Sequence, residues 1–377
     1  MNSTTIKSTC GRLAALAAIC VAAALPSFAE MVEWNGEAGK GGEGDAKRPC
    51  SRITFKEMPS TMLYGDTSRN GPKRPFAKDP TVIRHDGKYF MYYSVRNYDK
   101  AHFRKGGDPN LLKSWWGAVA VSTNLVDWMR IGDIEIAGGR FTSAAVAPCV
   151  KKIDGKIHMF HQAHYQADKK GEEWYCTSKN AKIWHATSED GVHFTCDGAA
   201  PAFSPSNTWS ISRAIDAEVY RVGDRLMLMY ATRDPSNVWQ MLGMAWAPYG
   251  SGYGPGTWTE ITTGAPFFRP DLPWEMHCIE APTVVERKGI WYMFYAGAYN
   301  HERQQIGVAW SKDGVNFRRW SDEPVFPHGK PGSWNAWESG HPGVFKDDDG
   351  RIYLFFQGKA TLKGDYSLSC VEVVFED

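Results

Sequence analysis

The sequence predicts an all-β protein that forms a single five-bladed β-propeller, with four antiparallel strands in each blade. A hairpin signal occurs five times: a short strand, a turn of the Asp-Gly or Gly-Asp type, and an aromatic-rich strand. The five copies start at positions 79, 147, 216, 281 and 341, an interval of about one blade with its loops. Further strand signals follow most hairpins, and five closed blades leave no long sheet edge exposed.

The N-terminal residues are expected to precede the propeller. Lys7 and Arg12 come before an apolar run over 13–25, and Ser27-Phe28-Ala29 has the small-x-small pattern of a cleavage site. Residues 1–29 therefore resemble a secretory signal peptide, and we expect an exported protein, periplasmic or extracellular. The apolar run is too short to predict a membrane span.

The propeller is expected to occupy residues 59–377, after a flexible leader over 30–58 that is rich in glycine and charge. Ring closure usually combines the two ends of a chain, so we expect the final strand of the last blade to come from the N-terminal side, where 61–64 is a candidate. No helix-length amphipathic pattern and no second domain are indicated. The five predicted blades cover 78–135, 140–203, 210–268, 275–326 and 336–375.

Charge and aromatic content favour a carbohydrate as the partner. The formal net charge is +1, or −1 without the predicted signal peptide, so no nucleic-acid partner is indicated. Flat aromatic rings suit stacking on sugars, which makes Trp115, Trp116 and Trp337 candidate pocket residues; the alternative is that they fill the wedges between blades. The sequence makes no prediction of oligomeric state.

Three acidic residues stand where the innermost strands begin. Asp79 and Asp216 hold the first position of the first and third copies, and Glu280 directly precedes the fourth copy. In a propeller these positions converge on the central axis, so we expect the three acids to meet. Glycoside hydrolysis needs such a group: one carboxylate activates water, and one acid with a raised pKa protonates the leaving oxygen. A third can tune the second. The alternative is that the aspartates cap turns.

These motifs resemble glycoside hydrolase family 43 and its five-bladed relatives in families 32, 68 and 117. The resemblance rests on Asp79-Pro80, Ala147-Pro148, Asp216, Glu280-Ala281-Pro282 and His341, and it covers the chain from about residue 75 to the end. It implies that Asp79 is the general base, that Asp216 tunes the acid, and that Glu280 is the general acid of an inverting reaction. It also implies that His341 contacts an axial water or a structural calcium ion, and that no organic cofactor is required.

Some residues depart from the family pattern or add to it. Ala217 follows Asp216 in place of proline, and strand alternation puts Glu218 on the same side as Asp216, where it would share the tuning role. Arg233-Asp234-Pro235 matches a fructosidase tripeptide, but its place after a hairpin favours a turn. Arg213 is expected to hold a hydroxyl or carboxylate of the substrate, or to form a surface ion pair. The candidate substrate-binding residues are Trp115, Trp116, His161, Arg213, Glu218, Arg233, His277, Trp337 and His341.

The sequence therefore predicts an exported exo-glycosidase that removes α-L-arabinofuranosyl or β-D-xylosyl units from poly- or oligosaccharides with inversion. Two alternatives remain at this stage. One is a retaining, fructosidase-like hydrolase that uses Asp79 as its nucleophile. The other is a sugar-binding propeller without catalytic activity.

Overall fold

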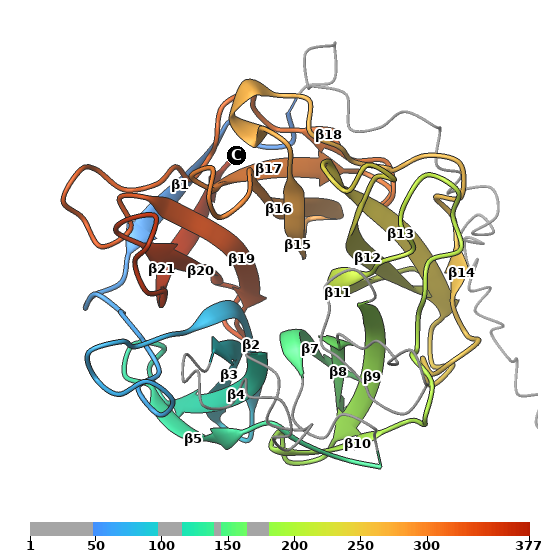
Figure 1. Ribbon diagram of the computed structural model, residues 1–377, viewed down its shortest axis with the longest axis horizontal. Helices are drawn as coiled ribbons and strands as arrows, with labels where there is room; N and C mark the ends of the chain where they lie inside the picture. The colour runs from blue at the N-terminus through green and yellow to red at the C-terminus, as the bar shows by residue number, and fades with distance from the viewer. Residues whose placement is uncertain (1–47, 97–114, 139–144, 164–180) are drawn as a thin grey trace, which may run out of the picture.

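The computed structural model describes residues 48–96, 115–138, 145–163 and 181–377, and it confirms the five-bladed propeller. The five sheets surround a central axis, and the first strand of each lies innermost (Figure 1). Blade 1 contains β2 (Lys78–His85), β3 (Lys88–Arg96), β4 (Trp115–Ser122) and β5 (Met129–Asp133). Blade 2 contains β7 (Val146–Ile153), β8 (Lys156–Ala163), β9 (Lys182–Ser188) and β10 (His193–Cys196).

The other three blades repeat this order. Blade 3 contains β11 (Ile215–Val222), β12 (Arg225–Arg233), β13 (Gln240–Pro248) and β14 (Thr259–Glu260). Blade 4 contains β15 (Ile279–Arg287), β16 (Ile290–Gly297), β17 (Gln305–Ser311) and β18 (Arg318–Arg319). Blade 5 contains β19 (Glu338–Lys346), β20 (Ile352–Lys359), β21 (Ser367–Glu376) and β1 (Arg52–Glu57). A 3₁₀ turn, η3 (Pro273–Glu275), precedes β15.

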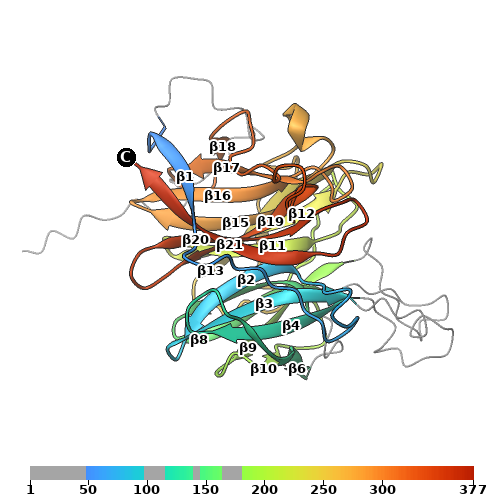
Figure 2. The same ribbon diagram turned by 90° about the vertical axis from the view of Figure 1, so that its left-hand side faces the viewer.

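The ring closes through β1, which comes from the N-terminal side as expected. This strand pairs antiparallel with β21, from Arg52 opposite Glu376 to Glu57 opposite Val371, and Figure 2 shows the two side by side. The expectation of a flexible leader over 30–58 is therefore wrong at β1. The reason is its period-two pattern: Ile53 is buried and Phe55 packs on Phe326. The candidate strand over 61–64 contributes only a bridge from Tyr64 to Leu368. Residues 1–47 lie outside the described ranges.

Blade 2 carries one strand more than the repeat predicts. The strand β6 (Glu135–Ala137), which leaves blade 1, adds parallel to β10 at the outer edge of blade 2. It thereby covers an edge that would otherwise be open to pairing with another chain. Within the described ranges, no helix is long and apolar enough to cross a membrane.

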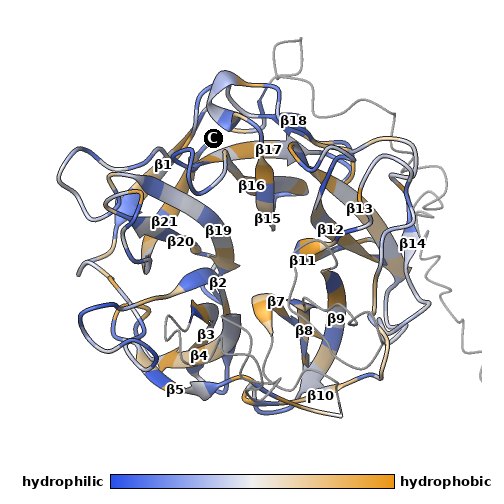
Figure 3. Ribbon diagram, viewed as in Figure 1, coloured by the Kyte–Doolittle hydropathy of each residue, from blue (hydrophilic) through white to orange (hydrophobic). Residues whose placement is uncertain are grey.

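Apolar side chains and a few tyrosines join neighbouring blades. Hydrophobic residues concentrate along the strands, for example on β7 and β11, whereas the outer loops are mostly hydrophilic (Figure 3). The buried Tyr92 hydroxyl of blade 1 donates to the Gly191 carbonyl of blade 2, at 2.8 Å. Tyr220 of blade 3 makes the equivalent bond to Gly314 of blade 4, at 2.6 Å. A blade is therefore held by a turn of the next blade as well as by packing.

We expect Gly314→Ala to destabilise the fold more than Gly350→Ala does. Both glycines have a left-handed backbone, with φ of 75° and 86°. A Cβ at position 314 would lie 2.5 Å from Val222 Cγ2, whereas nothing lies within 4 Å at position 350. Strain plus overlap should cost about 2–4 kcal/mol at 314, against about 1–2 kcal/mol from strain alone at 350. Chemical denaturation would measure both, and equal losses would contradict the packing argument.

Candidate active site

A β-bulge at the start of each innermost strand builds the site. In β2, β7, β11, β15 and β19 the pairing register shifts at the start of the strand. One residue of each bulge has a left-handed backbone, which is costly for a non-glycine residue and therefore marks a position held by its surroundings. These residues are Asp79, Ala147, Asp216, Ala281 and His341, with φ of 55°, 43°, 50°, 49° and 39°. They are the five positions that the sequence repeats placed in register.

Each bulge frees a backbone amide, and in four blades a side chain of the preceding blade accepts its hydrogen bond. This satisfies a buried donor and ties the orientation of one blade to the next. The bonds run from Ala147 N to Ser94 Oγ (2.8 Å), from Asp216 N to Gln162 Oε1 (2.8 Å), from His341 N to Gln304 Oε1 (3.2 Å) and from Asp79 N to Gln357 Oε1 (3.3 Å).

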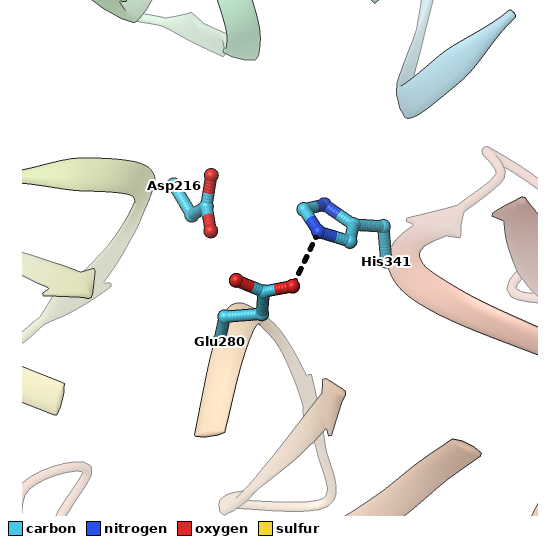
Figure 4. Close-up of side chains that lie close together, drawn as sticks. All are labelled: Asp216, Glu280 and His341. Carbon is cyan, nitrogen blue, oxygen red and sulfur yellow. Dashed lines mark hydrogen bonds and ion pairs between the residues drawn. The ribbon is translucent and has the colours of Figure 1, made fainter. Parts of the chain in front are cut away.

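His341 lies between two of the predicted catalytic acids. Its Nδ1 is 2.8 Å from Asp79 Oδ1, and its Nε2 is 2.9 Å from Glu280 Oε1. Figure 4 shows His341, Glu280 and Asp216 pointing toward one another from three blades. Burial opposes the charged imidazole, but Asp79 and Glu280 outweigh it and raise the pKa of His341 well above its usual value. His341 is therefore an imidazolium flanked by two carboxylates.

Asp79 is held in its ionised form. Burial favours the neutral acid, but Lys78, whose Nζ is 3.8 Å from Asp79 Oδ1, and then His341 lower the pKa of Asp79 below its usual value. Lys78 also donates to Asn300 Oδ1 at 3.2 Å. Asp79 can accordingly accept a proton at any pH near neutrality.

Glu280 is also ionised, because three donors face it. Besides His341, Gln304 Nε2 donates to Oε1 at 2.7 Å, and Gln240 Nε2 donates to Oε2. Burial raises the pKa of Glu280, but the charge and hydrogen bond of His341 lower it to about 2. Gln240 in turn accepts from Arg233 Nε at 3.1 Å, so Glu280 lies toward Arg233.

Asp216 is the acid of this pair whose pKa is raised. Burial raises the pKa of Asp216 to about 7, and the negative charges of Glu280 and Asp79 add to this against the effect of His341 and Arg213. Its Oδ2 has no hydrogen-bond partner among the described residues. One ligand atom of each of Asp216, Glu280 and His341 lies within 4.8 Å of the others. These pKa directions differ from the expectation that Asp216 keeps Glu280 protonated, and that expectation stays a prediction.

The three acids face one cavity at the axis. This cavity has a volume of about 320 Å³, and its basic lining residues are Lys78, Arg213, Arg233 and His341. Beyond the bulges, the axis narrows to a space of about 40 Å³. A second cavity of about 450 Å³ adjoins the first and shares Arg233, Tyr299 and Asn300 with it. The remaining lining residues of the first cavity are Asp79, Trp115, Val146, Gln162, Ile215, Asp216, Glu280, Tyr299 and Asn300.

Several predicted substrate-binding residues lie where expected. Trp115, Arg213, Arg233 and His341 line the first cavity. His277 lines the second cavity, where its Nδ1 is 3.0 Å from Glu302 Oε1.

Other predicted residues lie outside these two cavities. Trp116 is buried in blade 1 beneath Arg69, whose guanidinium carbon is 3.7 Å from a ring centroid, because neighbouring strand residues point to opposite faces. His161 is buried, and Trp337 donates to the Asn300 carbonyl at 3.2 Å. Neither side chain is part of either cavity lining.

Glu218 is displaced by the bulge that positions Asp216. The register shift between Ile215 and Glu218 breaks the alternation that placed Glu218 beside Asp216. Its carboxylate instead accepts from Lys151 Nζ and from Val284 N, both at 2.8 Å. Glu218 thus links blade 3 to blades 2 and 4, and the expected tuning role does not fit this position.

The sequence reasoning missed Lys78 and the two glutamines on Glu280. Gln240 and Gln304 each stand three residues before a glycine, Gly243 and Gly307, at the third strand of consecutive blades. Aligning the third strands of the blades, as well as the first strands, would have shown that Gln240 and Gln304 occupy equivalent positions.

The predicted turn at Arg233-Asp234-Pro235 is confirmed. Asp234 Oδ1 accepts from Val238 N and Trp239 N, both at 2.9 Å, and Oδ2 accepts from Ser236 N at 3.2 Å. The carboxylate therefore stabilises a loop, and the fructosidase tripeptide has no catalytic counterpart here.

The expected contact of His341 with a calcium ion stays a prediction. Both ring nitrogens face carboxylates, and a protonated imidazole has no lone pair for a metal. The single charge of this ring compensates one of the two negative charges of Asp79 and Glu280. Asp216, Glu280 and His341 each offer one ligand atom within 4.8 Å of the others.

Comparison with known proteins identifies the family. A family model described as glycosyl hydrolases family 43 matches residues 76–370. Among curated proteins, a 1,2-β-oligomannan phosphorylase from Thermoanaerobacter sp. (strain X514) is 23% identical over 191 residues, which is 50% of this chain and 52% of that protein. The chain thus spans about half the length of this relative.

Two of the similar solved structures show the shared propeller. A thermostable family-43 glycoside hydrolase has a TM-score of 0.59 and 19% identity, covering 80% of this chain and 90% of that chain. An α-L-arabinofuranosidase from Lactobacillus brevis has a TM-score of 0.51 and 17% identity, covering 78% and 90%. Since the family model matches most of the chain, the protein belongs to glycosyl hydrolases family 43.

Proposed function

We propose that the protein is an inverting exo-glycosidase that removes terminal α-L-arabinofuranosyl units, or alternatively β-D-xylosyl units, from oligosaccharides or polysaccharides. The observation that carries this proposal is the His341 ring between Asp79 and Glu280. A ring between two carboxylates favours the wide separation of inverting enzymes, roughly 6.5–9.5 Å, over the roughly 5–5.5 Å of retaining enzymes. The narrow axial space supports exo action, because a sugar chain cannot continue through it. The α-L-arabinofuranosidase of the same fold supports the choice of sugar.

In the proposed reaction, Asp79 takes a proton from water as the water oxygen bonds to the anomeric carbon. The bond from that carbon to the leaving oxygen breaks on the opposite face, and the leaving oxygen receives a proton from Glu280. Glu280 lies toward Arg233 and the second cavity, where the remainder of the substrate would extend. Asp216 is the proton reservoir: its proton passes to Glu280 as charge develops on the leaving oxygen. Solvent then removes the proton from Asp79 and restores the one on Asp216.

Proton NMR of the first-formed anomer tests this function. The enzyme would be given aryl and oligomeric α-L-arabinofuranosides and β-D-xylosides, and we expect release of the inverted sugar from at least one series. Release with retention would assign Asp79 as a nucleophile and contradict the proposed mechanism. No release from either series would contradict the proposed sugars.

The reservoir role predicts a pH dependence. With a pKa of about 7, Asp216 holds its proton below about pH 7 and loses it as the pH rises. We therefore expect kcat/KM to fall above about pH 7 with a slope of one proton. Asp216→Asn should lower the activity and abolish this limb, because an amide does not titrate there. A limb that persists unchanged in Asp216→Asn would assign the proton to another group.

We also propose that activity needs no metal, because His341 supplies the positive charge between the acids. Exhaustive treatment with a chelator is expected to leave kcat/KM unchanged. A loss that calcium restores would contradict this.

Export is proposed from residues 1–29 alone. Expression with these residues should give a mature protein outside the cytoplasm, with an N-terminus near Glu30. A cytoplasmic protein that retains residue 1 would contradict export.

A further inference from the structure

Arg213 carries a buried charge for which the described residues provide no hydrogen bond at two of its nitrogens. Its side chain is only 5% exposed, it lines the first cavity, and Nε and Nη1 have no partner there. Burying an unpaired guanidinium is costly, so a protein retains one where something else pairs with it. Burial and the nearby Arg233 lower the pKa of Arg213, against the opposing effect of Asp216 and Glu280.

Arg233 lies close to Arg213 and also has no carboxylate partner among the described residues. Its Nε donates to Gln240 Oε1 at 3.1 Å, its Nη1 lies 3.4 Å from Asn237 Oδ1, and its guanidinium carbon is 5.0 Å from the Tyr299 ring centroid. These neutral contacts orient the guanidinium without cancelling its charge.

Among the described residues, more basic than acidic side chains line the first cavity. Four are basic: Lys78, Arg213, Arg233 and His341. The three acids are Asp79, Asp216 and Glu280, and Asp216 keeps a proton below about pH 7. Neutral pentosides do not need such an excess, whereas an anionic substrate is attracted by it.

The two arginines also stand at a defined place relative to the reaction. Arg233 lines both cavities, together with Tyr299 and Asn300. Through Gln240 it connects to Glu280, which faces the leaving oxygen in the proposed reaction. Arg213 lines the first cavity only, so a group held between the two arginines would lie where the cavities meet, next to the leaving oxygen.

We propose that Arg213 and Arg233 bind a carboxylate on the leaving sugar, so that the preferred substrate carries its terminal pentose on a uronic acid. Hydrogen bonds between a guanidinium and a carboxylate are charge-assisted, and Nε and Nη1 of Arg213 have no partner among the described residues. The proposal rests on the glycosidase function proposed above and names the substrate class of the same site. An inorganic oxyanion such as phosphate shares this chemistry, so the test distinguishes the two.

The test compares an acidic oligosaccharide, in which the pentose is linked to a uronic acid, with the same compound after reduction of the carboxyl group to an alcohol. We expect the protein to prefer the acidic form in kcat/KM by roughly 10- to 100-fold, as a charge-assisted hydrogen bond predicts. Arg213→Gln and Arg233→Gln should each bring this ratio close to one, while Arg213→Lys retains part of it. The control is Arg221→Gln, an exposed arginine of β11, which should leave the ratio unchanged.

Equal kcat/KM for both forms, or a preference that Arg213→Gln does not reduce, would overturn the proposal. A folding defect is separated by thermal unfolding: Arg213→Gln removes an unpaired buried charge, so its midpoint should equal or exceed that of the wild type. Added inorganic phosphate should neither accelerate the reaction nor appear in the product. Formation of a pentose 1-phosphate would overturn the proposal by assigning the two arginines to an attacking phosphate.

Calorimetry with free glucuronate, galacturonate and the matching neutral sugars separates this proposal from the proposed function. Arg213-dependent binding of a uronate, in a protein that cleaves neither pentoside series, would support the carboxylate subsite while the pentosidase function fails. Cleavage of neutral pentosides without a preference for uronates would leave that function standing and overturn the subsite.

Discussion

Asp79→Asn is expected to lower kcat by roughly 10²- to 10⁴-fold on every substrate, including those with excellent leaving groups. The reason is that the attacking water must lose a proton whichever group departs. An amide of similar size keeps the shape of the site, but it cannot accept that proton. Steady-state rates on dinitrophenyl pentosides and on oligosaccharides would measure the loss.

A matched control for Asp79→Asn is Glu218→Gln. Glu218 is also a buried carboxylate on an innermost strand, but its partners are Lys151 and the Val284 amide, and it lies outside the first cavity. We expect this variant to lose stability and to keep kcat within a few-fold of the wild type. If Asp79→Asn instead loses activity only on substrates with poor leaving groups, Asp79 is the acid and the proposed roles are wrong.

Glu280→Gln is expected to show the opposite dependence on the leaving group. On oligosaccharides, whose leaving alcohol needs a proton, kcat/KM should fall by roughly 10²- to 10⁴-fold. On dinitrophenyl pentosides the loss should be much smaller, because dinitrophenolate departs without one. A Brønsted plot of log kcat/KM against leaving-group pKa should therefore become steeper in the variant.

Asp216→Asn distinguishes the donor from the reservoir in the same experiment. If Glu280 delivers a proton that it receives from Asp216, Asp216→Asn should also slow oligosaccharides more than dinitrophenyl pentosides, and the Brønsted slope should become steeper in both variants. A steep slope in Asp216→Asn combined with a flat one in Glu280→Gln would show that Asp216 delivers the proton directly. The comparison is needed because the lowered pKa of Glu280 means that it must gain a proton before it can donate one.

The fold prediction depended on local sequence signals. Hairpins depend on residues that are close in sequence, such as the Asp86-Gly87 turn, where φ is 47° and 74° as a type I′ turn requires. Equivalent positions of successive repeats lie at equivalent places around the propeller axis. Aligning the repeats therefore predicted that Asp79, Asp216 and Glu280 converge. The prediction of a leader failed at β1 because a six-residue strand outside the repeat has no partner that the repeat reveals.

Predictions for single side chains failed where backbone irregularity or a distant partner decided the outcome. The bulge at Asp216 changed the direction of Glu218, although alternation holds in a regular strand. At Trp115 and Trp116 consecutive side chains do point to opposite faces of the strand, so only Trp115 lines the first cavity and Trp116 is buried. Burial raises the pKa of Asp216, whereas the charge and hydrogen bond of His341, from another blade, lower the pKa of Glu280 against its burial.

The sequence by itself determined the propeller, the family and the convergence of three acids, because repetition and strand periodicity are local properties. Only the tertiary structure decided which acid holds the proton, that His341 is a cation between two carboxylates, and that Arg213 and Arg233 face one cavity without an acidic partner among the described residues. These properties are sums of charge and burial over side chains from different blades. They are therefore defined only when the ring has closed and the five blades are in place.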